Sequence, residues 1–419
     1  MSRKQITDFL VSSPDRAVYF LLAASVSAVI LGIAAAEILL AMAMAGAVWL
    51  WRRGGIRSRL RSSGLLPLAL FAAWGFVTAF AAGASLGDAL HGNKKAFLYA
   101  ILFFVPFAAS RIGDLVGTYR SIFLFSAISA CAGLIQFALN PHRDWLHRIS
   151  GFMSIWMTYA GLLMLVLVAL AAYAICLRKD RPWRWILPLG LIIAAALLLS
   201  ETRNAWYGSI AGIGAVLLLG RRFGATAGLV LLLFGIYLGS PESIKQRVRS
   251  SWDLEDDNTR NRLELFGTSL RMIRANPWLG VGPENVSHEA LKYRGTQEFP
   301  DWMYQHMHNN ILQIAAERGI PGLVLWLWFM LGLAWDAFKV LRSSQRESPG
   351  GASGPEWMIS TAALGGWVAL LVAGLFEYNF GDSEVLFLFL FMTAAPAAVL
   401  AAREGAARIR AASSIEAQK

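Results

Sequence analysis

The stretch MTYAGLLMLVLVALAAYAICL (157–177) decides the fold class of this chain. It contains no charged side chain, and an α-helix needs about 20 mostly apolar residues to cross the hydrocarbon core of a bilayer. On both sides of this stretch, apolar blocks of roughly this length recur along the whole sequence. The chain is 56% hydrophobic and only 16% charged, whereas a soluble domain carries about a quarter charged residues. The sequence therefore predicts an all-α polytopic membrane protein.

Twelve apolar blocks are predicted to span the membrane. They cover residues 17–35, 37–51, 64–83, 96–110, 115–139, 157–177, 185–200, 205–219, 224–240, 319–338, 359–378 and 384–401. The predicted organisation is spans one to nine within 1–240, a large outside loop over 241–318, spans ten to twelve within 319–401, and a cytoplasmic tail over 402–419. No small-residue cleavage site follows the first block, so we expect it to be a retained helix.

The net charge of +11 is distributed in a way that indicates topology rather than nucleic-acid binding. Both terminal segments and alternate short loops are rich in Lys and Arg, namely 52–63, 177–184, 221–224 and 339–346. The opposite loops carry few, namely 87–95, 140–148, 201–204 and 377–384. Because Lys and Arg mark the cytoplasmic side, we expect both termini in the cytoplasm and the second set of loops outside.

The long outside segment has a near-neutral charge balance and contains its own helical pattern. Leu263, Phe266, Leu270 and Ile273 recur at three- and four-residue spacing, which predicts an amphipathic helix lying along the membrane surface. The Pro and Gly residues of NPWLGVGPEN (276–285) then end this helix in a turn. In the eighth predicted span, GSIAG (208–212) is a pattern of small residues that indicates close helix packing.

Five of the basic residues on the predicted outside face are candidate ligands, because the topology rule disfavours positive charge there. Arg203 follows the seventh span, Arg262 opens the amphipathic helix, and Arg148 precedes the sixth span. An arginine near a membrane surface is often only an anchor, but its planar fork of donors also matches phosphate oxygens. Lys94 and Lys95 either bind a lipid phosphate or face water. These side chains are the candidate ligands for an anionic substrate.

His308 lies at the outer mouth of the tenth span and is the candidate general base. A lone interfacial histidine is more often structural, yet imidazole is the side chain best suited to accept a proton near neutral pH. We expect no metal site with His306, since helical metal pairs usually stand about four residues apart and no matching carboxylate cluster is evident nearby. Glu377, Asp382 and Glu384 lie in another outside loop, where one of them could orient the histidine or bind a sugar hydroxyl.

Three motifs, in this order, resemble signatures of the O-antigen ligase family. They are SETRNAW (200–206), RLELFGTSLRMIRANPWLGVGPEN (262–285), and His308-Asn309 followed after nine residues by Gly319-Ile320-Pro321-Gly322. The twelve-span layout with one large outside loop is similar as well. The chain departs from the family pattern at Glu201-Thr202, where smaller residues are expected, and at Phe266, where Trp is common.

The resemblance implies a glycosyltransferase of the inverting membrane type that uses lipid-linked sugars at the periplasmic face of a bacterial inner membrane. The implied donor is O-antigen on undecaprenyl diphosphate, and the acceptor is a sugar of lipid A–core oligosaccharide. No cofactor, nucleotide or metal is implied. We expect Arg203 and Arg262 to hold the diphosphate and His308 to deprotonate the acceptor hydroxyl. Arg148, Lys94, Lys95, Asn309 and Asp382 are the further candidate substrate-binding residues.

Other functions remain open at this stage. An O-antigen polymerase would use the same donor, and Arg271, ten residues and Gly282 fit a loose polymerase pattern. A protein O-oligosaccharyltransferase usually carries a larger outside domain after the last span. A twelve-span transporter would have two six-span halves joined by a long cytoplasmic loop and buried charges along its path. A flippase for the same lipid would not need the His308 segment.

Overall fold

The computed structural model describes residues 14–52, 62–109, 111–140, 148–177, 183–239, 242–249, 253, 257–295, 299–347 and 353–416. Over these residues all regular secondary structure is helical. The helices on the predicted spans are α2 (Pro14–Ala28), α3 (Ile33–Arg52), α4 (Leu65–Ala81), the 3-10 helix η1 (Lys94–Ala100) with α6 (Ile101–Ala108), α7 (Ile112–Leu139), α8 (Trp156–Cys176), α9 (Trp183–Leu199), α10 (Arg203–Leu219), α11 (Phe223–Gly239), α15 (Asn310–Glu347), α16 (Pro355–Ala373) and α17 (Ser383–Glu416). The shorter elements are α5 (Leu86–Gly92), α12 (Glu242–Arg249), α13 (Asp257–Ala275), α14 (Val286–Glu289), η3 (Ala290–Tyr293), η4 (Asp301–Gln305) and η5 (Asn379–Gly381).

The prediction of an all-α polytopic membrane fold is confirmed. Six of the described helices are long and apolar enough to cross a bilayer, namely α3, α7, α8, α15, α16 and α17. Shorter apolar helices cover 16–28, 65–81 and 184–199. Each predicted block falls on a helix, but several of these helices are short for a span, so the count of twelve stays a prediction.

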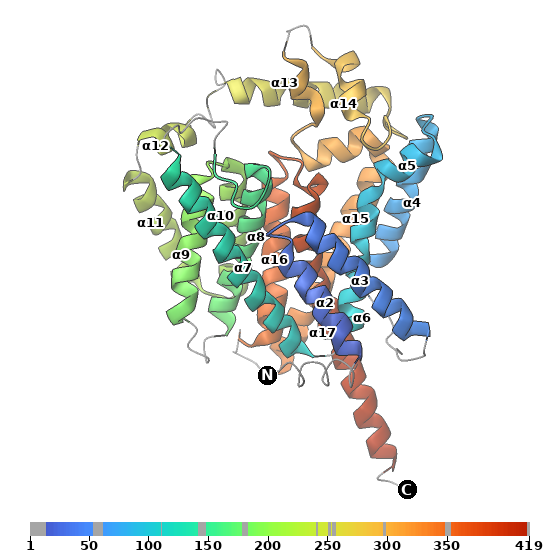
Figure 1. Cartoon of the computed structure of the whole chain (residues 1–419), viewed down its shortest axis with the longest axis vertical. Coiled ribbons are helices and arrows are strands. Elements are labelled where there is room, and N and C mark those ends of the chain that lie inside the picture. The colour runs from blue at the N-terminus through green and yellow to red at the C-terminus, as the bar shows by residue number, and fades with distance from the viewer. Residues whose placement is uncertain are drawn as a thin grey trace.

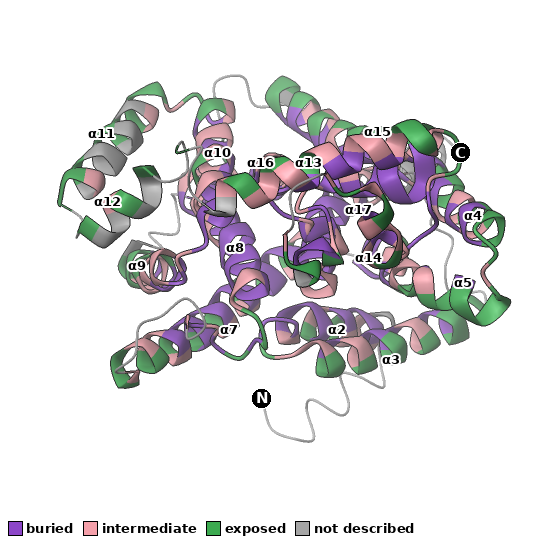
Figure 2. Ribbon diagram, turned by 90° about the horizontal axis from the view of Figure 1, so that it is seen from above, coloured by how far each residue is buried: buried purple, intermediate pink, exposed green. Residues whose placement is uncertain are grey.

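The centre of the bundle is built from α8, α16 and α17, and Figure 2 shows α8 and α17 buried while α3, α5 and α7 lie at the periphery. Helix α10 packs closely against α16 because small residues face one another. A Cβ on Gly208 would crowd the carbonyl of Ala369, and one on Gly212 would crowd the carbonyl of Gly365. The predicted packing role of GSIAG is thus confirmed. This close contact fixes where the first turn of α10 lies.

Figure 1 shows α13 and α14 across one end of the bundle, which we call the capped end. The first residue of α2 and the last turns of α17 lie toward the opposite end, which we call the tail end. Helix α13 packs against α15 over a small core of its own that includes Leu265 and Met272. The predicted amphipathic helix is therefore present, with Leu265 and Met272 packed inward and Leu263 and Phe266 exposed. That it lies along the membrane surface stays a prediction.

Two glycine-containing motifs far apart in the sequence form one backbone junction at the capped end. Helix α15 breaks at Gly319, whose φ of 68° is in the left-handed region that favours glycine. The N–H of Ile320 donates to the carbonyl of Pro277 (2.8 Å), and the N–H of Val281 donates to that of Ala316 (2.9 Å). Side chains at Gly319 or Gly280 would overlap the facing backbone. The junction holds the capped-end turn of α15 rigidly under the outside segment.

Candidate functional site

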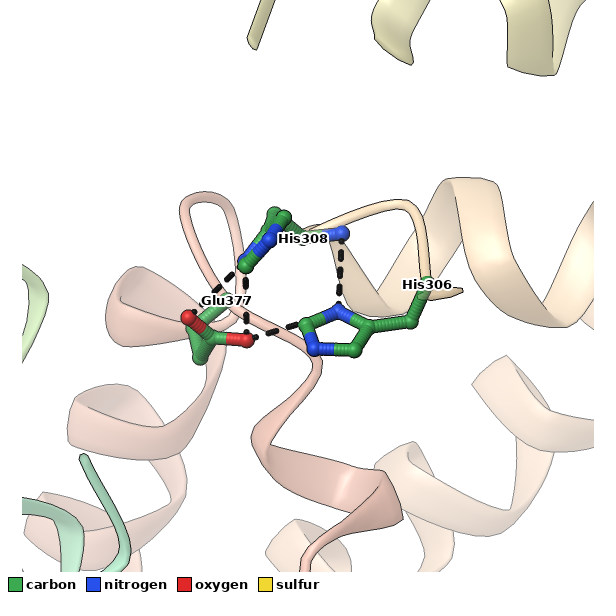
Figure 3. A group of neighbouring side chains, drawn as sticks. All are labelled: His306, His308 and Glu377. Atoms are coloured by element: carbon green, nitrogen blue, oxygen red, sulfur yellow. Dashed lines mark hydrogen bonds and ion pairs between the residues drawn. The ribbon is translucent and has the colours of Figure 1, made fainter. Parts of the chain in front are cut away.

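Two histidines and one glutamate meet at the capped end, as Figure 3 shows. Nδ1 of His308 lies 3.0 Å and 3.1 Å from the two carboxylate oxygens of Glu377. Nδ1 of His306 lies 3.6 Å from Oε1 of Glu377, and the two imidazole rings are 4.1 Å apart between centroids. The histidines come from the segment between η4 and α15, and Glu377 comes from the segment between α16 and η5. Of the three carboxylates in the outside loop that could orient the histidine, Glu377 is the one that lies beside it.

The backbone around His308 is fixed by the residue that follows it. Asn309 caps α15, since its Oδ1 accepts the N–H of Leu312 (3.0 Å) and its Nδ2 donates to the carbonyl of Leu375 (3.0 Å). His308 itself has a φ of 44°, which is uncommon for a side-chain-bearing residue. Both polar atoms of the Asn309 amide thus bind backbone, which gives Asn309 a structural role, and its predicted substrate contact stays a prediction.

Asn310 ties the start of α15 to the loop that carries Glu377. Its N–H donates to the carbonyl of Gly374 (2.7 Å), its Nδ2 donates to Oδ1 of Asn379 (2.6 Å), and its Oδ1 accepts the N–H of Phe380 (3.0 Å). Asn310 is fully buried, so these bonds are costly to leave unmade. They hold the His308 and Glu377 segments at a fixed separation.

A buried polar chain on α15 supports the same segment from below. Oε1 of Gln313 accepts the N–H of Met307 (2.8 Å), and Nε2 of Gln313 donates to Oε1 of Glu317 (2.8 Å). Glu317 also accepts the N–H of Glu284 (3.2 Å) and pairs with Arg318. Sequence reasoning missed Gln313 and Glu317. Their four-residue spacing on an otherwise apolar helix was the available signal, since it places both on one inward face.

The electrostatics of the cluster favour an ionised Glu377 and a neutral His306. Burial opposes ionisation of Glu377, but the charge and hydrogen bond of His308 hold its pKa at about 2. Burial lowers the pKa of His306 to about 4, against the opposing pull of Glu377. Since the carboxylate accepts a proton-bearing Nδ1, His308 presents Nε2 as its proton acceptor; this tautomer follows from the hydrogen bond.

A cavity of about 360 Å³ lies beside the cluster, between the membrane helices and the outside segment. One wall is apolar and comes from α8, including Met157 and Met164. The opposite wall is polar and includes Lys95, Asn204, Glu284, His306, Glu377 and Asp382. A volume of this size suits a small ligand group such as a sugar unit.

The two arginines expected to bind phosphate lie on helices that both contact Phe376, the residue before Glu377. The guanidinium of Arg262 lies over the ring of Phe376, 5.8 Å from its centroid, and Phe376 directly precedes Glu377. Arg203 is the buried first residue of α10, and one turn later the ring of Tyr207 lies 6.0 Å from that of Phe376. Phe376 therefore contacts both elements that carry the arginines.

Lys94 and Lys95 surround a single carboxylate. Their Nζ atoms lie 3.6 Å and 3.8 Å from the carboxylate of Glu284, and His91 is 3.7 Å from it. Burial lowers the pKa of Lys95, which also lies 5.8 Å from the ring centroid of Tyr378. Lys95 and Glu284 line the cavity, so this cationic group reaches the same space as His306.

Asp382 and Arg148 have different positions relative to the cavity. Asp382 lines it, accepts a hydrogen bond from the hydroxyl of Thr158 and caps α17 through the N–H of Val385 (3.1 Å). Burial raises the pKa of Asp382. Like Arg203 and Arg262, Arg148 is not among the described residues that line the cavity. It lies 5.5 Å from the ring centroid of Trp156 and 4.0 Å from Glu201.

The family comparison agrees with this picture. The O-antigen ligase family model matches residues 188–327, which contain Arg203, Arg262 and His308. A protein of Rickettsia conorii named as a polysaccharide ligase is 26% identical over 278 residues, covering 62% of this chain and 64% of its own length. The O-antigen ligase of Pseudomonas aeruginosa is 29% identical over 195 residues, covering 45% of this chain and 42% of its own length. The chain thus matches less than two thirds of either relative's length, and the resemblance indicated by the three motifs is confirmed.

A chain from a solved peptidoglycan synthase complex superposes with a TM-score of 0.43 and 18% sequence identity. The superposition covers 81% of this chain and 97% of that chain. A likeness at this level is too distant to inform the chemistry of the site.

Proposed function

We propose that this chain, a membrane protein of the O-antigen ligase family, is a glycosyltransferase. It transfers O-antigen polysaccharide from undecaprenyl diphosphate to a sugar hydroxyl of lipid A–core oligosaccharide. The single observation that carries the proposal is the His308–Glu377 pair at 3.0 Å, placed beside a polar cavity at the capped end of a membrane bundle. A base held by a carboxylate is what a weakly nucleophilic sugar hydroxyl requires.

The acceptor half of the reaction rests on His308. Nε2 of His308 takes the proton of the acceptor hydroxyl as its oxygen attacks the anomeric carbon of the donor. The carboxylate of Glu377 holds Nδ1–H and stabilises the imidazolium that forms, as in other base–carboxylate pairs. Gln313 and Asn309 act as positioning residues, because they fix the backbone on either side of His308.

The donor half rests on Arg203 and Arg262. As the new bond forms, the bond between the anomeric carbon and the diphosphate oxygen breaks on the opposite face, so the anomeric centre inverts. The bond's electrons leave with the diphosphate, which gains a negative charge. Two guanidinium groups in a partly buried site stabilise that charge without a metal or a nucleotide. The position of Arg262 over Phe376, and the contact of Tyr207 on α10 with the same ring, support this role.

The remaining predicted residues receive secondary roles. Lys94 and Lys95 bind an anionic group of a substrate, in exchange for Glu284. Asp382 accepts a hydrogen bond from a sugar hydroxyl in the cavity. Arg148 lies apart from the cavity and guides the anionic lipid at longer range.

The proposed location is the bacterial inner membrane, with the capped end in the periplasm and both termini in the cytoplasm. The charge of the short loops supports this orientation. The segment 241–318 is then the periplasmic loop, spans one to nine lie within 1–240, spans ten to twelve lie within 319–401, and 402–419 form the cytoplasmic tail.

An in vitro transfer assay tests the function. Purified chain is mixed with undecaprenyl-diphosphate-linked O-antigen and lipid A–core, with chelator and without nucleotide. The expected product is lipid A–core carrying O-antigen, formed by wild type and by His288→Ala, since His288 is an exposed histidine on α14. If the lipid-linked chains became longer and the lipid A–core stayed bare, the polymerase function would replace the ligase function. No product of either kind would move the assignment toward transport.

A further inference from the structure

The cluster of His306, His308 and Glu377 has the geometry of a metal site as well as that of a base. One ligand atom from each of the three side chains lies within 4.8 Å of the other two. The Nδ1–carboxylate distances are 3.0 Å for His308 and 3.6 Å for His306. In a tetrahedral zinc site with bonds of about 2.0–2.1 Å, neighbouring ligand atoms stand about 3.3–3.4 Å apart. Both histidine–carboxylate separations are therefore within a few tenths of an ångström of this spacing.

The donor set selects a particular class of ion. Two imidazoles and one carboxylate suit a borderline-soft ion such as zinc, whereas calcium and magnesium require several oxygen ligands. His306 and Glu377 line the cavity, which leaves a fourth position open toward it. Three protein ligands with one open position is a common zinc arrangement.

The ligands are held in place by groups outside the cluster. Oε1 of Glu377 accepts the N–H of Tyr378 (3.0 Å), which fixes the carboxylate. Gln313 binds the N–H of Met307, the residue between the two histidines. Such supporting hydrogen bonds keep ligand side chains oriented and raise metal affinity.

We propose that His306, His308 and Glu377 bind one zinc-like divalent ion, and that the bound ion inhibits the chain. The ion takes Nδ1 of His308 and the carboxylate of Glu377. A neutral imidazole bound to metal through Nδ1 carries its proton on Nε2, so it has no acceptor left for a hydroxyl proton. The inhibitory role rests on the proposed function, whereas the binding of the ion does not.

Metal binding is measured on the full chain in detergent after treatment with chelator. Titration with Zn²⁺ by calorimetry is expected to give one ion per chain. The affinity is expected to fall at least about tenfold in His306→Ala and Glu377→Gln, as for the loss of groups that make up a metal site. His288→Ala is the matched control and is expected to bind like wild type. Absence of stoichiometric binding to wild type would overturn the site, as would unchanged affinity in both cluster variants.

A second measurement protects the test against misfolded variants. Co²⁺ added to the chelated wild type is expected to give the visible absorption of a four-coordinate site with nitrogen and oxygen ligands. A spectrum of free aqueous Co²⁺ would overturn the site without any variant being made.

The inhibitory role has its own readout. One equivalent of Zn²⁺ is expected to stop transfer by wild type, and chelator is expected to restore it. Stoichiometric binding with unchanged transfer would keep the site and overturn the inhibition. A metal-free chain that shows no transfer would refute the proposed function and with it the inhibition, while calorimetry alone decides the site.

Discussion

The two ends of α15 carry buried polar groups that are arranged in opposite ways. At the capped end, Gln313 and Glu317 belong to a network that borders a polar cavity. At the tail end, Asp336 is fully buried and bonded to its neighbours: Oδ2 accepts the hydroxyl of Ser62 (2.7 Å), and Oδ1 lies 2.8 Å from Nζ of Lys339.

A second closed network joins the other helices at the tail end. Arg403 on α17 pairs with Glu356 on α16 and donates to the hydroxyls of Ser343 and Ser344 on α15. The nearest cavity on α15 toward this end is lined mostly by apolar side chains such as Trp328 and Trp335. The tail-end polar groups therefore bind one another and join the segment before α4 to α15, and α15 to α16 and α17.

The two ends separate contributions to stability from contributions to function in this chain. A polar network that is closed on itself stabilises the fold, and its loss lowers the free energy of unfolding. A network beside a polar cavity positions groups for a ligand, and its loss lowers a rate. Substitutions at the two ends are therefore expected to change different measured quantities.

The largest effect is expected from His308→Ala at the capped end. Loss of a general base typically lowers a rate by about 10²–10⁴-fold, so transfer is expected to fall by that amount. The substitution also removes a hydrogen bond from the buried carboxylate of Glu377, so the rate is compared per folded molecule. The transfer assay measures the rate and a thermal unfolding midpoint measures stability. Full activity in this variant would refute the role of His308.

A smaller loss of rate is expected from Arg262→Lys. Lysine keeps the charge but not the planar fork or the stacking on Phe376, and a charge-assisted hydrogen bond is worth about 1.5–3 kcal/mol. Transfer is expected to fall roughly ten- to a hundredfold, since each 1.4 kcal/mol is a factor of about ten. Arg260→Lys, on the exposed side of the same helix, is the control. Equal losses in the two variants would show that the loss does not depend on the position of Arg262 over Phe376.

At the tail end, Asp336→Ala is expected to lower stability and to leave the rate per folded molecule unchanged. The substitution leaves the Ser62 hydroxyl and the Ser63 N–H without their carboxylate acceptor and removes the ion pair of Lys339. An unsatisfied buried group costs about 1–3 kcal/mol. A lowered thermal midpoint together with a normal specific transfer rate is the expected result. If transfer fell while the midpoint stayed constant, the two ends would not be separable in this way.

The smallest effect is expected from Glu284→Gln, which tests Lys94 and Lys95. Partly exposed ion pairs are worth about 0.2–1 kcal/mol, so removing the competing carboxylate is expected to lower the substrate KM by about five-fold at most. Glu289→Gln, whose partner Lys292 lies elsewhere, is the control. A raised KM in Glu284→Gln would mean that the carboxylate binds substrate rather than competing with it.

The sequence alone determined the fold class, the helical blocks and the motifs. Hydrophobic length and charge at the loop ends are local properties of the chain. In a bilayer they set directly which segments span it and in which orientation. The same local reasoning identified Arg203, Arg262 and His308 as candidates, and it named Glu377 only as one of three possible carboxylates. It assigned Asn309 to substrate, although the amide of Asn309 caps a helix.

Only the tertiary structure decided which carboxylate meets which histidine. Glu377 is 69 residues from His308 in sequence, and the two meet because Asn310 ties the start of α15 to the end of α16. The packed face of α13 and the junction at Gly319 were decided in the same way, by backbone contacts between distant segments. Spacing along a chain predicts neighbours within a helix, but contacts between loops depend on how whole helices pack, which no local pattern encodes.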